Sequence, residues 1–330
     1  MKFKVFNATP EESQIALNWG KVHNVDIETT PHLLTMDELP GLAGIDGIIN
    51  LQIGQLEPEL YPALNQLGIK QIAQRGAGTD MYNMALASAN DIIITNVPSY
   101  SPESIAEFAL TLALQLIRKT EDIRLRIEAH NFRWENVICG RVLGQMTVAI
   151  LGTGRIGQAT AKMFKSVGCR VIGYDLYPSE QMEGIIEYKE SIMEAVEEAD
   201  VISLHMPPSP ETHHLFDKAM FERLKPDAIL INTARGALIN TEDLLEALDL
   251  GLLAGAGIDT YEFEAPYIPK DWTGQPLEDQ TFEALIHHPK VIYTPHVAYF
   301  TDEAVKNLVE GALNATLDIV KTGTTQNRVN

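Results

Sequence analysis

The stretch Val148-Ala149-Ile150-Leu151-Gly152-Thr153-Gly154-Arg155-Ile156-Gly157 decides the fold of this chain. It reads as an apolar strand, a G-x-G-x-x-G turn and the start of a helix. In this setting Gly152 permits a tight turn, Gly154 lets the backbone approach a pyrophosphate, and Gly157 lets helix and strand pack closely. The helix N-terminus beyond them favours an anion. The stretch predicts a dinucleotide site, with Arg155 and Ile156 beside the cofactor.

Asp175 identifies which dinucleotide fits. It ends the next strand, VIGYD, eighteen residues after Gly157. A carboxylate at this point can accept both ribose hydroxyls and repels a 2′-phosphate. Neither Leu176 nor Tyr177 is basic, so the pattern favours NAD over NADP. The alternative is a glycine turn with a capping aspartate and no ligand.

Short β-rich runs alternate with helical runs on both sides of this stretch, which favours parallel sheets with helices on both faces. One series precedes it and a second begins at Thr147, so we expect an α/β chain of two doubly wound domains. The last helical run, at about 302–321, is expected to return to the first domain. The expected strands are Lys2–Asn7, Val25–Thr29, Gly47–Leu51, Ile69–Gln74 and Asp91–Asn96, then Thr147–Leu151, Arg170–Tyr174, Val201–His205, Ala228–Asn232, Leu253–Ile258 and Val291–Tyr293.

Composition excludes several classes of partner. The 330 residues hold 25 Lys and Arg against 45 Asp and Glu, a net charge of −20 that repels nucleic acid and anionic lipid. No run is apolar enough for a membrane helix and the N-terminus lacks a signal-peptide core, so we expect a cytoplasmic protein. Cys139 and Cys169 form no motif. The pairs at 213–214 and 287–288 are histidines without metal-ligand spacing, and we expect no metal.

Three expected strands lead into residues that can carry chemistry. The strand ILIN leads to Arg235, the strand GAGI leads to Asp259, Glu262 and Glu264, and VIYTP leads to His296. Ligands of parallel sheets bind at these carboxyl ends. Each group alone also fits a plain interpretation: a surface arginine, a solvated acidic loop and a core histidine.

Together these groups fit one reaction, in which a nicotinamide exchanges hydride with a carbon. An imidazole near neutrality can move the proton on the adjacent oxygen, and a carboxylate beside it favours the imidazolium. A guanidinium fork can hold a substrate carboxylate and polarise the neighbouring carbonyl. The substrate class that uses all three groups is a 2-oxo acid, or a 2-hydroxy acid in the reverse direction.

The motifs resemble those of the D-specific 2-hydroxyacid dehydrogenases over essentially the whole chain. They are NVPSYSPESIAEFAL at 96–110, LGTGRIGQ at 151–158, NTARGALI at 232–239, IDTYEFE at 258–264 and TPHVAYFT at 294–301. The resemblance implies a Rossmann NAD-binding domain at 101–299 and a flavodoxin-like substrate domain at 1–100 and 300–330, with a cleft between them. It also implies a homodimer, in which Trp134 either reaches the neighbouring active site or is an ordinary packed aromatic.

The resemblance assigns Arg235 as the substrate-carboxylate anchor, Glu264 as the partner of the histidine and His296 as the acid/base. Alternation along an extended segment leaves Glu262 as an equal candidate, and the family match alone selects Glu264. Further cofactor contacts are implied for His205, Met206, Pro207, Thr233, Ala234 and Asp259, and further substrate contacts for Leu51, Ala77, Gly78, Tyr100 and Tyr299.

The chain departs from the family pattern at two places. Relatives often read R-N-V-G-V-D-N where this chain has RGAGTDM at 75–81, but backbone donors near Ala77 and Gly78 tolerate that change. At Leu51, lactate-preferring relatives tend to carry tyrosine, and leucine resembles the branch acting on 2-hydroxyisocaproate.

The glutamate at 264 speaks against formate dehydrogenase, where glutamine is expected. Two rival functions remain: an NAD(H)-sensing binding protein on the same fold, and a glyoxylate or hydroxypyruvate reductase.

Overall fold

The computed structural model describes residues 1–330, which divide into two compact units. The first unit comprises Met1–Ser101 with Phe300–Asn330, and the second comprises Pro102–Tyr299. The division places Ser101 with the first unit, whereas the sequence interpretation placed it with the second. No helix of either unit combines the length and apolar character that a membrane span requires.

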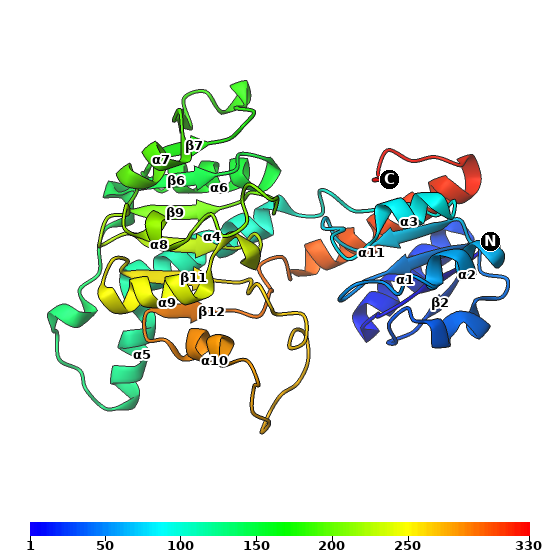
Figure 1. The fold of residues 1–330 in the computed structure, drawn as a ribbon, viewed down its shortest axis with the longest axis horizontal. Helices are drawn as coiled ribbons and strands as arrows, with labels where there is room; N and C mark the ends of the chain where they lie inside the picture. The colour runs from blue at the N-terminus through cyan, green and yellow to red at the C-terminus, as the bar shows by residue number, and fades with distance from the viewer. The chain divides into compact units, whose positions relative to one another are not determined.

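The first unit is a five-stranded, wholly parallel sheet in the order β2-β1-β3-β4-β5 (Figure 1). This is the flavodoxin-like order, with the switch in direction between β1 and β3. The strands are β1 (Lys2–Val5), β2 (Asp26–Thr29), β3 (Gly47–Asn50), β4 (Gln71–Gln74) and β5 (Ile93–Thr95), and the helices are α1 (Pro10–His23), α2 (Leu60–Gln66), α3 (Met84–Ala89) and α11 (Asp302–Thr322).

Side chains of this sheet alternate between two cores. Ile48, Ile72 and Ile94 pack under the face that α2 covers. On the opposite face α11 lies against β3 and β4 and packs on α1. The last residues of the chain then pair with β5 in the antiparallel sense, where Val329 N donates to Ile94 O at 3.0 Å and a bridge joins Thr95 to Arg328. The C-terminal segment thus covers the edge of the sheet.

The second unit is a seven-stranded parallel sheet in the order β12-β11-β10-β9-β6-β7-β8 (Figure 1). Counted from β6, this is the doubly wound order of a dinucleotide-binding domain with one more strand. The strands are β6 (Thr147–Leu151), β7 (Arg170–Tyr174), β8 (Glu187–Tyr188), β9 (Val201–Leu204), β10 (Ile229–Asn232), β11 (Gly255–Ile258) and β12 (Val291–Tyr293), and the helices are α4 (Pro102–Arg118), α5 (Thr120–Glu128), α6 (Arg155–Ser166), α7 (Ile192–Glu198), α8 (Lys218–Phe221), α9 (Thr241–Leu250) and α10 (Gln280–His287).

Both faces of this sheet are buried, as its strand sequences require. Val148 and Ile150 pack with α4 and α6 on one face, while Ala149 and Leu151 pack with α7, α8 and α9 on the other. A parallel strand covered on both sides reads as a continuous apolar run, which is why TVAIL was recognisable. The expected α/β fold of two parallel-sheet domains is therefore confirmed, with five strands in the first unit and seven in the second.

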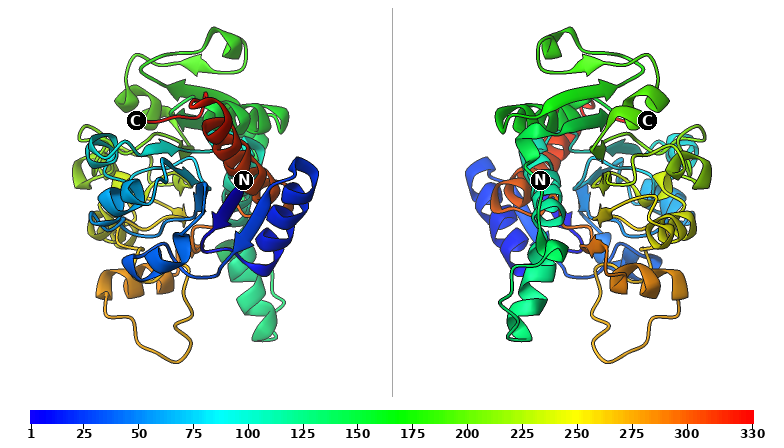
Figure 2. Two further views of the ribbon diagram at one scale, coloured as in Figure 1. Left: turned by 90° about the vertical axis from the view of Figure 1, so that its right-hand side faces the viewer. Right: turned by 90° about the vertical axis from the view of Figure 1, so that its left-hand side faces the viewer.

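Two segments extend from the second unit. Helix α5 projects from the body and contributes no buried residue (Figures 1 and 2). Between β11 and α10 the chain forms no helix or strand, and Figure 2 shows this gold loop reaching beyond α10 in both views. This irregular connection runs from Asp259 to Asp279.

Candidate active site

Six strands of the second unit end in register. Pairing joins Tyr174 to Leu151, Leu151 to Leu204, Leu204 to Asn232, Asn232 to Ile258 and Ile258 to Tyr293. The residue after each strand therefore lies on one line along the carboxyl edge of the sheet. In sheet order these are Thr294, Asp259, Thr233, His205, Gly152 and Asp175. All of these residues except Thr294 are candidate site residues from the sequence.

The glycine turn has the geometry that a pyrophosphate requires. Gly152 has a φ of +90°, and a Cβ there would lie 2.7 Å from the carbonyl carbon of His205. Gly157 packs so closely on Gly152 O that no Cβ fits. Gly154, by contrast, caps α6 and faces open space, since a Cβ there would meet nothing within 4 Å. The turn is closed against the protein and open on the side where a ligand would lie.

Asp175 is fixed at the end of β7. One carboxylate oxygen accepts from Thr153 N at 2.5 Å and from Thr153 Oγ1 at 3.2 Å, and the other accepts from Tyr177 N at 2.8 Å. The carboxylate is thus held beside the glycine turn before any ligand arrives. Oδ1, which accepts only the bond from Tyr177 N, retains a lone pair for a ribose hydroxyl.

His205 and Thr233 lie in the middle of the row of strand-end residues. His205 carries a neutral imidazole, and Thr233 carries a hydroxyl without a hydrogen-bond partner. Packing around the ring lowers the pKa of His205 to about 3, and its Nε2 lies 2.9 Å from Ser203 Oγ. Met206 is buried and Pro207 is exposed. Thr233 Oγ1 is buried without a hydrogen-bond partner. A buried hydroxyl of this kind needs a partner, and a bound dinucleotide could supply one. The residues present therefore fit NAD.

Arg235 follows β10 in a loop that its own strand end fixes. Asn232 Oδ1 accepts from Ala234 N at 3.0 Å and Asn232 Nδ2 donates to Arg235 O at 2.9 Å. The guanidinium donates through Nη1 to Ala234 O at 2.8 Å. The half-buried arginine is thereby presented at the carboxyl edge of the sheet.

His296 and Glu264 form a direct pair. His296 Nδ1 lies 2.5 Å from Glu264 Oε1, and the other oxygen of Glu264 accepts from Tyr261 N at 2.9 Å. The imidazole is about one-third exposed, with Nε2 left to face a substrate. This geometry orients the ring and places a negative charge where imidazolium would form. It is the arrangement of a general acid with its orienting carboxylate.

Asp259 builds the loop that presents His296. Its side chain is fully buried and accepts from Thr294 Oγ1 at 2.6 Å, Val297 N at 2.9 Å and Ala298 N at 3.0 Å. Asp259 O also accepts from His296 N at 2.8 Å. These four bonds hold His296 at a φ of +55°, a left-handed conformation that few residues other than glycine adopt. The sequence had placed Asp259 with the cofactor, and this role in shaping the loop was missed.

Glu262 points elsewhere. Its Oε2 lies 2.7 Å from His214 Nε2, and its Oε1 accepts from Thr241 Oγ1 at 2.9 Å. The sequence could not choose between Glu262 and Glu264 because alternation in an extended segment would place both on one face. The segment is a turn, in which Glu264 N donates to Tyr261 O, so the two carboxylates diverge. Glu264 alone contacts His296.

The expected substrate contacts of the first unit lie at the carboxyl ends of β3, β4 and β5. Leu51 O accepts from Asn7 Nδ2 at 3.0 Å, and Tyr100 O accepts from Asn307 Nδ2 at 2.7 Å. Ala77 O accepts from Asn96 Nδ2 at 2.7 Å. Both Ala77 and Gly78 are half-buried. Tyr299, also half-buried, is the last residue of the second unit.

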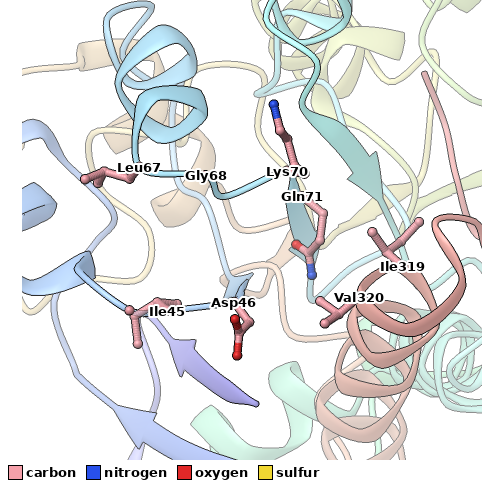
Figure 3. A pocket seen from close by; sticks show the side chains of 9 residues that line it. Ile45, Asp46, Leu67, Gly68, Lys70, Gln71, Ile319 and Val320 are labelled. Atoms are coloured by element: carbon pink, nitrogen blue, oxygen red, sulfur yellow. The ribbon is translucent and has the colours of Figure 1, made fainter.

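A hollow of about 380 Å³ elsewhere in the first unit contains none of these residues (Figure 3). Ile45, Asp46, Lys70 and Gln71 line it together with α11. Asp46 already accepts from Lys2 N at 2.7 Å, and Lys70 donates to Asn65. Across the whole chain, no three His, Cys, Asp or Glu side chains converge as a metal site.

The sequence of the second unit matches a known family model. Residues 110–298 match the model described as D-isomer specific 2-hydroxyacid dehydrogenase, NAD binding domain. The chain belongs to the D-isomer specific 2-hydroxyacid dehydrogenase family. It is an NAD-dependent oxidoreductase that forms a D-2-hydroxy acid from a 2-oxo acid. The resemblance seen in the motifs is confirmed, and the non-catalytic NAD(H) sensor is not supported.

Known members of the family match this chain from end to end. A D-lactate dehydrogenase of Streptococcus agalactiae serotype III (strain NEM316) is 61% identical over 330 residues, covering 100% of both chains. Among solved structures, a D-lactate dehydrogenase from Treponema pallidum has a TM-score of 0.93 at 40% identity and covers 100% of both chains. A D-2-hydroxyisocaproate dehydrogenase also has a TM-score of 0.93, at 36% identity, covering 100% of this chain and 99% of that one.

Proposed function

We propose that this dehydrogenase reduces pyruvate to D-lactate with NADH and also accepts larger 2-oxo acids such as 2-oxoisocaproate. The observation that carries the chemistry is the 2.5 Å pair of His296 Nδ1 and Glu264 Oε1 at the edge of the sheet that presents Arg235. The names of the similar proteins favour lactate, and Leu51 leaves more room than the tyrosine of lactate-preferring relatives. A change of about one methylene alters discrimination by only about 1–3 kcal/mol, so both acids can react.

In the proposed reaction Arg235 binds the substrate carboxylate and polarises the adjacent carbonyl. His296 donates its Nε2 proton to the carbonyl oxygen as the alcohol forms. Glu264 holds the ring through Nδ1 and stabilises the protonated form. In the reverse direction the neutral imidazole takes the hydroxyl proton back.

NAD supplies or accepts the hydride when it is bound. We assign its pyrophosphate to Gly152, Gly154, Arg155, Ile156 and Gly157. Its adenosine ribose is assigned to Asp175. The nicotinamide half is assigned to His205, Met206, Pro207, Thr233, Ala234 and Asp259. Support comes from the open space at Gly154 and the unpartnered hydroxyl of Thr233.

The first unit is proposed to select the substrate. The N–H groups of Ala77 and Gly78 have no protein acceptor, so they are available to a carboxylate. Leu51, Tyr100 and Tyr299 are the proposed contacts to the substrate side chain and carbonyl. A cleft that combines these residues with the second unit stays a prediction from the family resemblance.

We further propose a homodimer. Leu125, Ile127, Phe132, Val137 and Val142 are exposed apolar residues along α5 and the segment that follows it, and Trp134 is 97% exposed. Exposed apolar surface gathered on one projecting segment favours a protein partner. Size-exclusion chromatography with light scattering tests this, and a monomer at micromolar concentration would contradict it. A cytoplasmic location likewise stays a prediction.

The reaction is tested by following NADH consumption with pyruvate, 2-oxoisocaproate, phenylpyruvate and glyoxylate, with chiral analysis of the product. We expect turnover of the first two acids to the D product. His296→Gln should reduce kcat roughly 10²–10⁴-fold, while NADH binding, followed by fluorescence, is kept. Exclusive turnover of glyoxylate would favour the glyoxylate reductase alternative, and an undiminished His296→Gln would contradict the proposed acid.

A further inference from the structure

The site contains a second carboxylate–imidazole pair that the proposed chemistry does not use. Glu262 Oε2 lies 2.7 Å from His214 Nε2, and Glu262 Oε1 accepts from Thr241 N at 3.3 Å and from Thr241 Oγ1 at 2.9 Å. The Glu262 side chain is only 8% exposed, so these contacts are shielded from water. One carboxylate thus joins three separate segments of the second unit.

Both partners of Glu262 are tied to the segment that follows Arg235. His214 N donates to Ala237 O at 2.8 Å, and Thr241 begins α9. Gly236, directly after Arg235, packs with its Cα on the peptide that joins Tyr261 to Glu262, and no Cβ would fit there. The segment from Arg235 to Thr241 is therefore held against the turn at 261–264 by packing and by the Glu262 carboxylate.

The same turn carries Glu264. Its Oε2 accepts from Tyr261 N at 2.9 Å while its Oε1 contacts His296. The ring of Tyr261 is buried and stacks on Phe282 at a centroid distance of 4.8 Å, so the turn is anchored on its core side as well. Movement of Glu262 would be transmitted through Phe263 to Glu264, and through Gly236 to Arg235.

We propose that Glu262 and His214 are positioning residues that set the placement of Arg235 relative to the Glu264–His296 pair. The inference rests on the proposed roles of those three residues. A 2-oxo acid must bind through its carboxylate and present its carbonyl oxygen to His296 at the same time. An error of about 1 Å between two such groups can lower the rate roughly 100-fold. The Glu262–His214 contact fixes that relative placement before the substrate binds.

Glu262→Ala removes the contact, whereas Glu262→Gln keeps an oxygen for Thr241 and an amide for His214. We expect Glu262→Ala to lower kcat for the best 2-oxo acid about tenfold or more, with KM for NADH unchanged within about twofold. Glu262→Gln should retain most of the wild-type kcat. An equal loss in both variants would overturn the positioning role, since it would mean that the negative charge itself is required.

His214→Asn provides a second variant in case Glu262→Ala does not fold. His214 has a φ of +50°, a conformation that asparagine tolerates, so the backbone is not strained by the change. We expect a loss of kcat of the same kind, and no further loss when His214→Asn is added to Glu262→Ala, because the two residues act as a unit. Additive losses would overturn the proposal.

His32→Asn is the matched control. His32 Nδ1 lies 2.8 Å from Glu38 Oε1 in the first unit, so the variant breaks a histidine–carboxylate pair that contains none of the proposed site residues. We expect unchanged kcat and KM. Rates are expressed per NADH-binding site, so a mere loss of folded protein is not counted. A lower melting temperature with unchanged kcat per site in Glu262→Ala would show a purely structural role and overturn the inference.

Wild type and His296→Gln are measured in the same assay. A wild-type protein inactive towards every acid, or an undiminished His296→Gln, would contradict the proposed function itself. A strongly diminished His296→Gln beside a fully active Glu262→Ala would contradict only the inference about Glu262 and His214.

Discussion

His296 and Glu264 show how two ordinary residues become a catalytic pair. The backbone of His296 has a left-handed conformation, which bonds to Asp259 stabilise. The Nδ1 of its imidazole lies 2.5 Å from Glu264 Oε1. The ring therefore has one orientation and one nitrogen available to substrate. The chemistry depends on a loop that is fixed before any ligand binds.

Glu264→Gln tests the contribution of the carboxylate charge. The amide can keep a hydrogen bond to Nδ1 but cannot stabilise an imidazolium, so we expect kcat for 2-oxo acid reduction to fall about 10–100-fold. Steady-state kinetics with NADH and pyruvate measure the effect, and NADH binding should be unchanged. Unaltered reduction in this variant would mean that the observed pair has no catalytic importance.

His205 gives a prediction about stability and pH. Burial holds its pKa at about 3, well below the ordinary value of 6.5. As pH falls below about 6.5, the unfolded chain takes up a proton that the folded chain refuses until about pH 3. This residue therefore makes the fold less stable as pH decreases across that window, with no further loss below it.

The pH effect is measured by comparing urea unfolding of the wild type and of His205→Gln at pH 7.5 and pH 5. We expect the wild-type midpoint to fall more than the variant's midpoint over this interval. Equal changes in both proteins would contradict the low pKa of the native imidazole.

At the scale of elements, the C-terminal segment acts as an edge strand for β5. Asn96 N donates to Asn327 O at 3.1 Å, Val329 N donates to Ile94 O at 3.0 Å, and Ile94 N donates to Asn330 Oδ1 at 2.8 Å. An uncovered edge strand exposes a row of unpaired backbone groups. The segment therefore contributes to both stability and solubility of the first unit.

Removing residues 326–330 should lower the free energy of unfolding by about 2–5 kcal/mol. Two backbone bonds and three bonds of the Asn330 side chain, each worth roughly 0.5–1 kcal/mol, are lost, and β5 is exposed. Denaturant titration measures the change, and light scattering should detect association of the truncated protein. Asn330→Ala, which removes only side-chain bonds, should lose less. A truncated chain as stable as the full one would contradict this role.

Elements were predictable where the local pattern was strong. Thr147–Leu151, Arg170–Tyr174 and Val291–Tyr293 coincide with observed strands because they are apolar runs bounded by polar residues or glycines. Strand β8 is only two residues long and carries no such pattern. In the first unit, the strand expected at Asp91–Asn96 shortens to Ile93–Thr95. Asp91 belongs to the turn after α3, and Asn96 bonds to Asn327 of the C-terminal segment and to Ala77.

The site was predictable only in part, for a physical reason. Arg235, Glu264 and His296 follow recognisable strands, and parallel strands end at one edge, so sequence order locates them. The His214–Glu262 contact joins residues 48 apart through the loops after β9 and β11, and neither loop has a periodic pattern. The histidines at 213–214 lack metal-ligand spacing and were given no role from the sequence, and only the fold brings His214 to Glu262.

At the scale of the whole molecule, the two units contain separate cores, and we propose that they divide the work of binding. If the second unit binds NAD, hydrogen exchange should slow chiefly at the ends of β6, β7, β9, β10 and β11 when NAD is added. With NAD at about 100 times its Kd, exchange that requires opening of the bound unit should slow about 100-fold.

The strands β1 and β2 serve as internal controls for this measurement, because they belong to the first unit and lead to no proposed cofactor contact. We expect little change in their exchange with NAD alone. Protection concentrated in residues 1–101 instead would contradict the proposed assignment of the cofactor to the second unit.

The common register of the six strand ends has a consequence for altering this enzyme. A strand rises about 3.3 Å per residue. Deleting one residue from a single strand would withdraw its terminal group by that amount, but it would also turn side chains of that strand to the opposite face of the sheet, out of the core that they fill. Contacts along an extended ligand are therefore adjusted by substituting the residue that follows each strand, one strand at a time, and not by changing strand length.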